Sequence, residues 1–499
     1  MRVLFVSSEI YPLAKTGGLA DVSAALPLAL AGLGVDVRLL LPAYPQALEA
    51  AGNKSVAVEW IDAESGPVRL IAGMTPDSGL PLWLLDCPSL FHRKGGLYAD
   101  ESGRDWPDNA RRYALFCRVA AELARGDLLA DWQADLVHAN DWHTGLVPLL
   151  LAQHPEPRPK TLFTIHNLAF QGLFASERYG ELGLPAAHFS PAGLEFYGKI
   201  SFLKAGIAFA DHLTTVSPNY AREIQTGEFG CGLDGLLQQR GPQLSGILNG
   251  VDYRVWDPGS DSHLPANYTD KDSSGKRLCK AQLQRELGLE VQPSLPLVIY
   301  LSRVTDQKMA DVVLEALPPI LERGAQFALL GQGDPALERG FRAAEALYPG
   351  RIAARIGYEE PLAHRFFAGA DILLHPSRFE PCGLSQLYAL RYGTLPIVRS
   401  VGGLADTVVD ASDALIQLEV ANGFVFQQAS AAAMLGCLDR ALALYRQPVL
   451  WRKVQRVGMR QNFGWEASAR KYLTLYGQLV PEAVLMPELA DAAEERAVG

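Results

Sequence analysis

The strongest chemical signal in this sequence is a pair of cations that lie five residues apart, directly after a strand-like apolar run. Arg303 and Lys308 follow the run 297–301, and two cations in one loop can clamp a diphosphate and offset the charge that builds on it as it leaves. Glu380 lies in a second loop of this kind, after the run 372–375 and shortly before a glycine-opened helix. The sequence therefore predicts a carboxylate and an anion site that converge with the two cations.

A five-residue phrase, Gly-Gly-Leu-Ala-Asp, occurs twice, at residues 17–21 and at residues 402–406. Each copy follows an apolar strand-like run and precedes a stretch with helical spacing of apolar residues. A glycine pair in this position allows a ligand to approach the backbone and leaves N–H groups unpaired at the helix start. Lys15 adds a positive charge before the first copy, although the spacing is not that of a P-loop. The alternative is two ordinary tight turns beside a solvated lysine.

Two further segments of the first half place histidines directly after strand-like runs. The segment 138–143 reads His-Ala-Asn-Asp-Trp-His, in which the ring of Trp142 and the carboxylate of Asp141 suit sugar recognition. Packing of Trp142 into the core is an equal alternative. A metal site is disfavoured, because the spacing does not fit one helical face and no third ligand follows. His166, which precedes Asn167, could donate to a substrate oxygen, or it could be structural.

Strand-like runs alternate with helical stretches in both halves, which predicts an α/β fold with doubly wound parallel sheets and ligand sites at the carboxyl ends of the strands. The expected strands are 3–7, 37–41, 82–86, 136–138, 161–165 and 212–216 in the first half, and 297–301, 326–330, 351–355, 372–375 and 395–398 in the second. The clearest expected helices are 108–124, 145–154 and 465–479. The polar stretch 257–276 is expected to be a surface loop after a domain junction near 248–252, and its Asp-x-Asp at 270–272 is read as chance.

The bulk composition limits the class of protein. A chain of 499 residues favours two or three domains, and 48% apolar with 20% charged residues is an ordinary globular mixture. No run is long enough to span a bilayer, and the N-terminus carries no leader pattern, so we expect a cytoplasmic protein. Six scattered cysteines indicate neither a disulfide framework nor a zinc ribbon. A formal charge of −10 argues against a nucleic-acid partner and is compatible with a neutral polymer.

With these residues in view, the chain resembles bacterial glycogen synthase, with plant starch synthases as close relatives, from residue 1 to about residue 480. The motifs that carry the resemblance are 15–22 (KTGGLADV), His166-Asn167, 249–252 (NGVD), Arg303 with Lys308, and 377–384 (SRFEPCGL).

The resemblance implies the GT-B glycosyltransferase architecture, in which two Rossmann-like domains face each other across a deep cleft. Residues 1–248 would then form an acceptor domain, completed by a C-terminal helix at 463–482 that crosses back to it. Residues 249–462 would form the nucleotide-sugar domain, and 483–499 a poorly ordered tail.

The same resemblance implies transfer of glucose from ADP-glucose to the 4-hydroxyl at the non-reducing end of an α-1,4-glucan, with release of ADP and with retention at the anomeric carbon. Front-face substitution assisted by the leaving phosphate is the route that the family favours, and no residue is obviously committed to a covalent intermediate. The resemblance implies no cofactor and no metal, and its partners are the nucleotide sugar and the glucan, with no nucleic acid and no membrane.

The resemblance also implies roles for individual residues. Arg303 and Lys308 would bind the diphosphate, Glu380 would contact the donor glucose, and His166 would lie at the anomeric carbon, where its backbone carbonyl or its ring supports a cation-like transition state. The remaining residues assigned to substrate binding are Lys15, Gly18, Asp21, Tyr98, Asp141, Asn167, Asn249, Tyr358, Cys382, Gly383, Leu384 and Ser385. Among these, Gly18 would meet the diphosphate through its N–H, and Tyr358 would pack on the nucleotide base.

Two positions depart from the family pattern. Met309 stands where a glycine usually follows the clamping lysine, so the loop is expected to be shaped differently if that glycine needs a positive φ. Asn140 stands in place of a common histidine. Two alternatives stay open: an enzyme that uses UDP-glucose, because Tyr358 stacks on either base, and a glucan-binding protein without turnover, which only the Met309 change supports.

Overall fold

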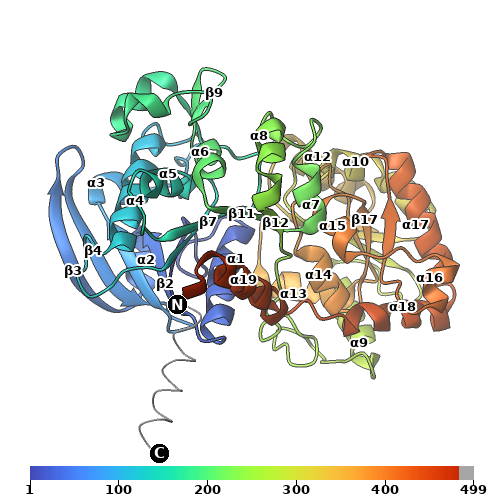
Figure 1. Ribbon diagram of the computed structural model, residues 1–499. Helices are drawn as coiled ribbons and strands as arrows, with labels where there is room; N and C mark the ends of the chain where they lie inside the picture. The colour runs from blue at the N-terminus through green and yellow to red at the C-terminus, as the bar shows by residue number, and fades with distance from the viewer. Residues whose placement is uncertain (483–499) are drawn as a thin grey trace, which may run out of the picture. The chain divides into compact units, whose positions relative to one another are not determined.

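The computed structural model describes residues 1–482, and the predicted poorly ordered tail at 483–499 lies outside the described residues. Within that range the chain divides into two compact units (Figure 1). Unit 1 contains residues 1–216 and 221–250 and the segment from Trp465 onward. Unit 2 contains 217–220 and 251–464. No helix of the described part is long and apolar enough to cross a bilayer.

Unit 1 is built on a nine-stranded sheet in the order β12-β11-β7-β6-β1-β2-β5-β4-β3. Seven strands are parallel, whereas β3 and β4 form an antiparallel hairpin on the β5 edge. The strands are β1 (Arg2–Val6), β2 (Asp36–Pro42), β3 (Gly52–Asp62), β4 (Gly66–Met74), β5 (Pro81–Asp86), β6 (Leu136–Asn140), β7 (Lys160–Ile165), β11 (His212–Thr215) and β12 (Leu244–Gly246). A small separate sheet contains β8 (Leu173–Ala175), β9 (Glu195–Phe196) and β10 (Lys199–Ser201).

Helices flank the large sheet of unit 1, and the C-terminal helix α19 is one of them (Figure 1). The helices are α1 (Gly18–Ala31), α2 (Pro45–Ala50), α3 (Pro88–Phe91), α4 (Asn109–Arg125), α5 (Leu146–Ala152), α6 (Phe202–Phe209), α8 (Asp234–Gln239) and α19 (Trp465–Leu479), with α7 (Pro218–Glu223) divided between the units. Helix α19 packs beside α1, and the hydroxyl of Tyr476 bonds Nδ1 of the buried His138 at 2.7 Å. The last described helix therefore completes the core of the N-terminal unit.

Unit 2 is a six-stranded parallel sheet in the order β15-β14-β13-β16-β17-β18. Its strands are β13 (Leu297–Leu301), β14 (Gln326–Gly331), β15 (Ile352–Ile356), β16 (Ile372–His375), β17 (Leu395–Arg399) and β18 (Phe424–Phe426). Its helices are α9 (Ser274–Leu287), α10 (Ala310–Glu315), α11 (Leu317–Glu322), α12 (Pro335–Leu347), α13 (Glu360–Gly369), α14 (Ser385–Arg391), α15 (Gly402–Thr407), α16 (Asp413–Gln417), α17 (Ala431–Tyr445) and α18 (Pro448–Arg460).

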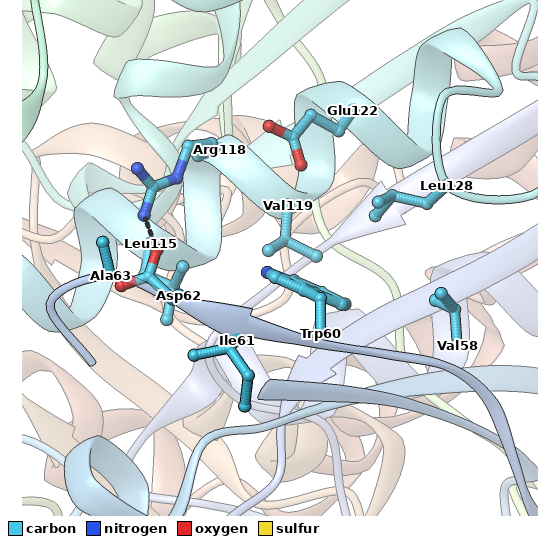
Figure 2. Close-up of a pocket in the computed structure, with 10 residues that line it drawn as sticks. All are labelled: Val58, Trp60, Ile61, Asp62, Ala63, Leu115, Arg118, Val119, Glu122 and Leu128. Carbon is cyan, nitrogen blue, oxygen red and sulfur yellow. Dashed lines mark hydrogen bonds and ion pairs between the residues drawn. The ribbon is translucent and has the colours of Figure 1, made fainter. Parts of the chain in front are cut away.

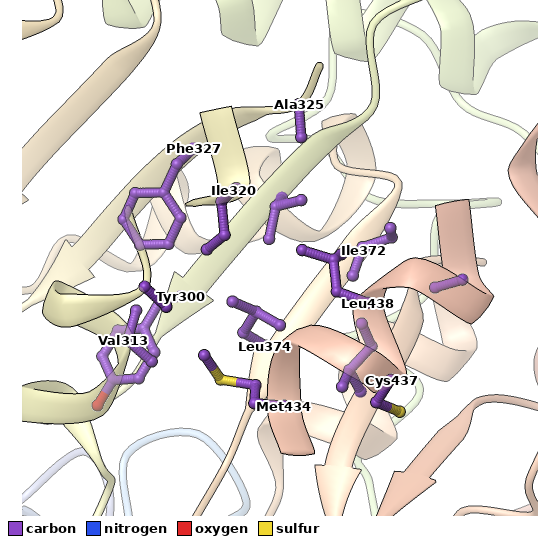
Figure 3. Close-up of a cluster of buried hydrophobic side chains, with 14 of the residues drawn as sticks. Tyr300, Val313, Ile320, Ala325, Phe327, Ile372, Leu374, Met434, Cys437 and Leu438 are labelled. Carbon is purple, nitrogen blue, oxygen red and sulfur yellow. The ribbon is translucent and has the colours of Figure 1, made fainter. Parts of the chain in front are cut away.

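One core cluster of unit 2 joins strand residues with helix residues (Figure 3). Tyr300 and Phe327 from adjacent strands lie beside Val313 of α10, while Met434 and Leu438 of α17 cover another part of the sheet. Burial of such apolar side chains stabilises the unit by about 1.5–3 kcal/mol for each large one. The cluster gives the loops at the strand ends a rigid base.

Both large sheets place a topological switch point beside predicted site residues. In unit 2 the chain order of the strands reverses between β13 and β16, which carry the loops of Lys308 and Glu380. In unit 1 it reverses between β1 and β6, which carry the loops of Lys15 and Asp141. Open α/β sheets bind ligands at the carboxyl ends of strands at such a point.

The prediction of a surface loop over 257–276 is wrong in part. Helix α9 already begins at Ser274, and Asp261, Tyr268 and Lys276 are buried. The ammonium of Lys276 lies within hydrogen-bonding distance of three backbone carbonyls and of the hydroxyl of Thr394, so polar partners surround this buried group. Polar composition does not mean exposure in this stretch, because these polar groups find buried partners in distant segments.

Candidate functional site

In unit 2, Lys308 and Glu380 meet as predicted from the two loops. The ammonium of Lys308 pairs with Oε2 of Glu380, and both side chains are largely buried. His375 Nε2 and Ser377 Oγ each lie 3.0 Å from the same Oε2 atom. All three partners therefore contact the same carboxylate oxygen of Glu380.

The charge state of this cluster follows from its contacts. Burial alone would raise the pKa of Glu380, but the Lys308 ammonium and the His375 ring outweigh burial and hold that pKa well below its usual range. Burial lowers the pKa of His375 against the opposing influence of Glu380, so the ring is neutral and donates from Nε2. The site thus presents an ionised carboxylate beside a cation.

Further contacts join the two loops. The backbone N–H of Arg378 donates to the carbonyl of Gln307 at 2.8 Å, and the Arg378 guanidinium forms a bidentate pair with Asp311. Arg303 is exposed, and its guanidinium contacts the Gln307 amide at 3.2 Å. The buried hydroxyl of Tyr300 donates toward the carbonyls of Arg303 and Lys308, at 3.0 and 3.2 Å. The loop of the two cations is therefore fixed at both ends.

Met309 takes the left-handed backbone conformation, with φ +55° and ψ +34°, and its side chain is completely buried in the core cluster of unit 2. A non-glycine residue in this region carries a strain of roughly 1–2 kcal/mol. The loop thus keeps the backbone shape that glycine permits, and the expectation of a differently shaped loop is wrong in this respect. Burial of the methionine side chain opposes the strain.

The second Gly-Gly-Leu-Ala-Asp copy heads α15 and packs against the loop of Glu380. Gly402 has φ +43°, and a Cβ there would collide with the carbonyl oxygen of Glu380. A Cβ on Gly403 would collide with Cys382, and the Gly403 N–H donates to the carbonyl of Glu380 at 3.1 Å. The aspartate of this copy, Asp406, accepts from the N–H of Asn219 at 2.7 Å. This glycine pair supports the carboxylate loop through its backbone.

The other predicted residues of unit 2 lie close to Glu380 in sequence or, in the case of Tyr358, after β15, at the edge of the sheet. Cys382 is buried, Gly383 has φ +75°, and Leu384 is the N-cap of α14. Ser385 Oγ contacts the carbonyl of Leu301 at 3.3 Å. Tyr358 lies in the loop after β15 with 55% of its surface exposed.

In unit 1 the first Gly-Gly copy begins α1 at Gly18, and Lys15 pairs with Asp21 at 2.7 Å. The loop is held by Glu9, which the sequence did not predict as a site residue. Its buried carboxylate accepts from the N–H groups of Thr16 and Gly17, at 2.6 and 3.1 Å. The backbone N–H groups of Thr16 and Gly17 are therefore already bonded to Glu9, and Gly18 is the first residue of α1.

Tyr98, predicted to bind substrate, belongs to the support of this loop. Its hydroxyl donates to Oε1 of Glu9 at 2.7 Å and lies 2.8 Å from Ser8 Oγ. Burial raises the pKa of Tyr98 well above its usual value. Its ring stacks on His143 at 4.4 Å.

Asp141 and His166 form the second cluster of unit 1, at the ends of the adjacent strands β6 and β7. Asp141 is buried with φ +58°, and its Oδ1 accepts from the N–H of His166 at 2.8 Å. Burial raises the pKa of Asp141 to about 7, although the N–H groups of His166 and Asn167 favour the ionised form. Backbone strain of this kind is concentrated at functional sites.

The ring of His166 is neutral. Burial lowers the pKa of His166 to about 3. Its Nε2 lies 2.9 Å from Oδ1 of Asn140. The side chain of Asn167 accepts from the N–H of Ala169 at 3.1 Å, which shapes the turn after His166.

The three remaining side chains of interest in segment 138–143, His138, Trp142 and His143, make packing or core hydrogen-bond contacts. Both nitrogens of His138 are hydrogen-bonded in the core, to Tyr476 and Thr164. The rings of Trp142 and His143 lie 3.9 Å apart inside an aromatic cluster, which supports the packing alternative for Trp142. Within residues 1–482 no group of three or more His, Cys, Asp or Glu side chains is placed to hold a metal ion.

Two further features of unit 1 are the buried side chain of Asn249 and a separate cavity. Asn249 is buried, and its Oδ1 has no hydrogen-bond partner among the described residues. A cavity of about 330 Å³ lies elsewhere, between β3 and α4, and contains no predicted site residue (Figure 2). There the ring of Trp60 lies near Val119, and Arg118 pairs with Asp62 at 2.8 Å (Figure 2).

Comparison with known proteins agrees with this arrangement. Residues 2–239 match the family model of the starch synthase catalytic domain, and residues 295–443 match that of glycosyl transferases group 1. A glycogen synthase of Burkholderia thailandensis is 55% identical over 482 residues, which cover 96% of this chain and 90% of that protein. A glycogen synthase of Paramagnetospirillum magneticum is 52% identical, with 96% and 98% covered. The chain belongs to the glycogen synthase family.

A solved structure extends the likeness of this glycogen synthase family member to its fold. The catalytic domain of starch synthase IV from Arabidopsis thaliana, bound to ADP and acarbose, has a TM-score of 0.86 at 33% identity and covers 96% of this chain and 99% of that one. The predicted family, the two-domain α/β GT-B fold and the glycosyltransferase class of the enzyme are confirmed.

The sequence did not predict the site contacts of two residues of this family member, Glu9 and His375. Glu9 follows the first predicted strand, and its partner Tyr98 lies 89 residues away. His375 was read as the last residue of a strand, yet it bonds Glu380 five residues later. A titratable residue at the carboxyl end of a buried strand was the available signal in both cases.

Proposed function

We propose that this protein is an ADP-glucose-dependent glycogen synthase, a retaining transferase that adds glucose to the 4-hydroxyl at the non-reducing end of an α-1,4-glucan. The observation that carries the proposal is the convergence of Lys308 and Glu380 at the switch point of unit 2, with Arg303 in the same loop as the lysine. Two cations and a carboxylate suit a glycosyl diphosphate, because the cations bind the leaving group and the carboxylate binds sugar hydroxyls.

In the proposed reaction the bond between the anomeric carbon and the phosphate oxygen breaks, and a bond to the acceptor oxygen forms on the same face. The leaving phosphate accepts the proton of the acceptor hydroxyl. Arg303 and Lys308 offset the charge that grows on ADP, and this contribution is larger in the transition state than in the bound substrate. Glu380 holds Lys308 through Oε2 and binds a donor hydroxyl through Oε1.

The remaining predicted residues take supporting roles in this proposal. Gly18 meets the diphosphate through its N–H, and Gly383 and Leu384 offer theirs, with Cys382 and Ser385 holding that loop. His166 lies at the anomeric carbon. Asp141, Asn167 and Asn249 bind sugar, Tyr358 packs on the base, and Lys15 and Asp21 shape the first loop. The ADP-bound starch synthase relative supports the choice of adenine as the donor base.

The deciding experiment measures nucleotide release from ADP-glucose and from UDP-glucose in parallel, with glycogen as the acceptor. We expect turnover with ADP-glucose and little with UDP-glucose. Preference for UDP-glucose would keep the enzyme and overturn the donor. No turnover with either donor, together with retained glycogen binding, would favour a glucan-binding protein without catalysis. We do not expect that outcome, because Lys308 still pairs with Glu380 although Met309 replaces the usual glycine.

A further inference from the structure

Asn140 occupies the last position of β6, at the switch point of unit 1, and is completely buried. Its Nδ2 atom donates to the carbonyls of Val6 and His138, at 3.0 and 3.3 Å. Carbonyl oxygens only accept, so the orientation of the amide is fixed and Oδ1 must point the other way. That oxygen lies 2.9 Å from Nε2 of His166.

This contact determines where the imidazole carries its proton. An amide oxygen accepts and never donates, so Nε2 of His166 bears the hydrogen. Nδ1 is then the unprotonated nitrogen and acts as a hydrogen-bond acceptor. The N–H of His166 is meanwhile fixed by Asp141, so both the backbone and the ring are held.

We propose that Asn140 is a positioning residue that keeps His166 as the neutral Nε2–H tautomer, so that His166 meets the donor sugar as a hydrogen-bond acceptor through Nδ1. The role of the sugar as the ligand rests on the proposed function, whereas the tautomer does not. A hydroxyl of the donor sugar can supply the hydrogen, and a group that only accepts, such as a carbonyl or ether oxygen, is disfavoured at this position. The site selects a sugar by the direction of one hydrogen bond.

The buried amide also explains why the ring stays uncharged. Asn140 offers His166 a dipole and no negative charge, so nothing at Nε2 compensates the burial that lowers the pKa of the ring. The titratable groups that face the ring are Asp141, which bonds the backbone of His166, and His138, which carries no charge because burial lowers its pKa to about 3. A carboxylate at position 140 would change this balance directly.

The test is nitrogen-15 NMR of selectively histidine-labelled protein, with the His166 signals identified from their loss in His166→Gln. We expect the wild type to show the Nε2–H pattern, and Asn140→Leu to lose it and to lower kcat by about 10- to 100-fold with a smaller change in KM. Asn140→His restores an acceptor nitrogen and is expected to recover the tautomer and most of the activity. Asn422→Leu is the matched control, because Asn422 is an equally buried amide that bonds Thr407, Gln461 and Val409.

An Nδ1–H pattern in the wild type, or an unchanged His166 spectrum in Asn140→Leu, would overturn the proposal. If Asn140→Leu does not fold, Asn140→Asp decides instead: its carboxylate should make His166 doubly protonated at a higher pH than in the wild type, and an unshifted titration would refute the contact. The spectra do not depend on turnover. An Nε2–H ring in a protein that transfers no glucose from any donor would therefore remove the proposed function and leave the tautomer assignment in place.

Discussion

Lys308 and Glu380, 72 residues apart in the chain, form a largely buried ion pair across two loops at the switch point of unit 2. Their atoms belong to loops that the Arg378–Gln307 hydrogen bond also joins. The pair therefore connects the loops after two strands, and it is also the proposed contact for the sugar donor. Removing either partner should affect both roles.

We expect Lys308→Ala and Glu380→Ala to lower kcat/KM by similar factors, about 10²- to 10³-fold or more, and the double variant to lose little beyond either single one. The reason is that each residue acts through the other. Each single variant should also lose about 3–5 kcal/mol of unfolding free energy, because a buried charge is left alone. Steady-state kinetics and urea unfolding measure the two effects.

The matched control is Lys280→Ala, which breaks another buried ion pair of unit 2, with Asp371 at 2.6 Å. It should lower stability and leave kcat nearly unchanged. Independent, multiplying losses in the Lys308/Glu380 double variant would contradict the joint action of the pair.

Variants of Met309 separate the energetic cost of its left-handed backbone from the stability that its buried side chain contributes. Met309→Ala should cost about 2–5 kcal/mol, because the side chain is completely buried. Met309→Gly loses the same contacts but relieves the strain at φ +55°, so it should be more stable than Met309→Ala by about 1 kcal/mol. Denaturant unfolding of the two variants gives the difference.

Val313 supplies the reverse case, since it is buried in the same cluster but lies inside helix α10 (Figure 3). There the order should invert, with Val313→Gly less stable than Val313→Ala by about 1 kcal/mol. The same order at both positions would mean that the backbone of Met309 is not strained.

Some features of the fold and of the site are predictable from the sequence and others are not. The difference depends on whether a contact follows from strand order or from packing between distant segments. The charged loops of Lys308 and Glu380 were predictable, because parallel strands bring their carboxyl ends together whatever their separation in the chain. The hairpin of β3 and β4 was not predicted, because most of β3 is exposed and lacks an apolar run. The partners of Glu9 and Lys276 were also beyond reach, since they are set by tertiary packing and not by neighbours in sequence.

Asp141 should make stability depend on pH in the neutral range. Burial raises its pKa to about 7, above the unfolded value of about 3.9, so its contribution is fully present below pH about 4 and is lost as the pH rises through 7. Asp141→Asn cannot ionise and should remove this loss, which falls mainly between pH about 4 and about 7. Urea unfolding at several pH values measures the slope.

Asp211→Asn is the comparison variant for that slope. Asp211 is paired with Arg158 in the same unit, and although burial opposes ionisation, its hydrogen bonds with Arg158 and Thr161 lower the pKa below the ordinary value. Its removal should reduce stability uniformly across the neutral range. An Asp141→Asn profile parallel to the wild type would rule out ionisation of Asp141 as the source.

Glu9 should control the loop before α1 without touching the substrate itself. Glu9→Gln replaces one acceptor oxygen by a donor, which opposes one of the N–H or O–H groups of Thr16, Gly17 and Tyr98. We expect a loss of about 1–3 kcal/mol in unfolding free energy and a fall in kcat/KM of about tenfold or more. Tyr98→Phe removes only one of these bonds and should show a smaller loss of both, whereas a larger loss would assign Tyr98 a direct role.

Variants of Cys382 test whether its thiol takes part in the reaction or whether the residue only shapes the loop before α14. Its thiol is buried, and the carbonyl of Cys382 accepts from the side chain of Gln386 at 3.0 Å, so the backbone of Cys382 helps to hold the loop. Cys382→Ser conserves the size and the backbone, and we expect it to keep most of the activity in the nucleotide-release assay. Gln386→Ala removes the bond to the backbone and should lower activity more than the serine variant does. Near-complete inactivity of Cys382→Ser in a folded protein would instead give the thiol a chemical role.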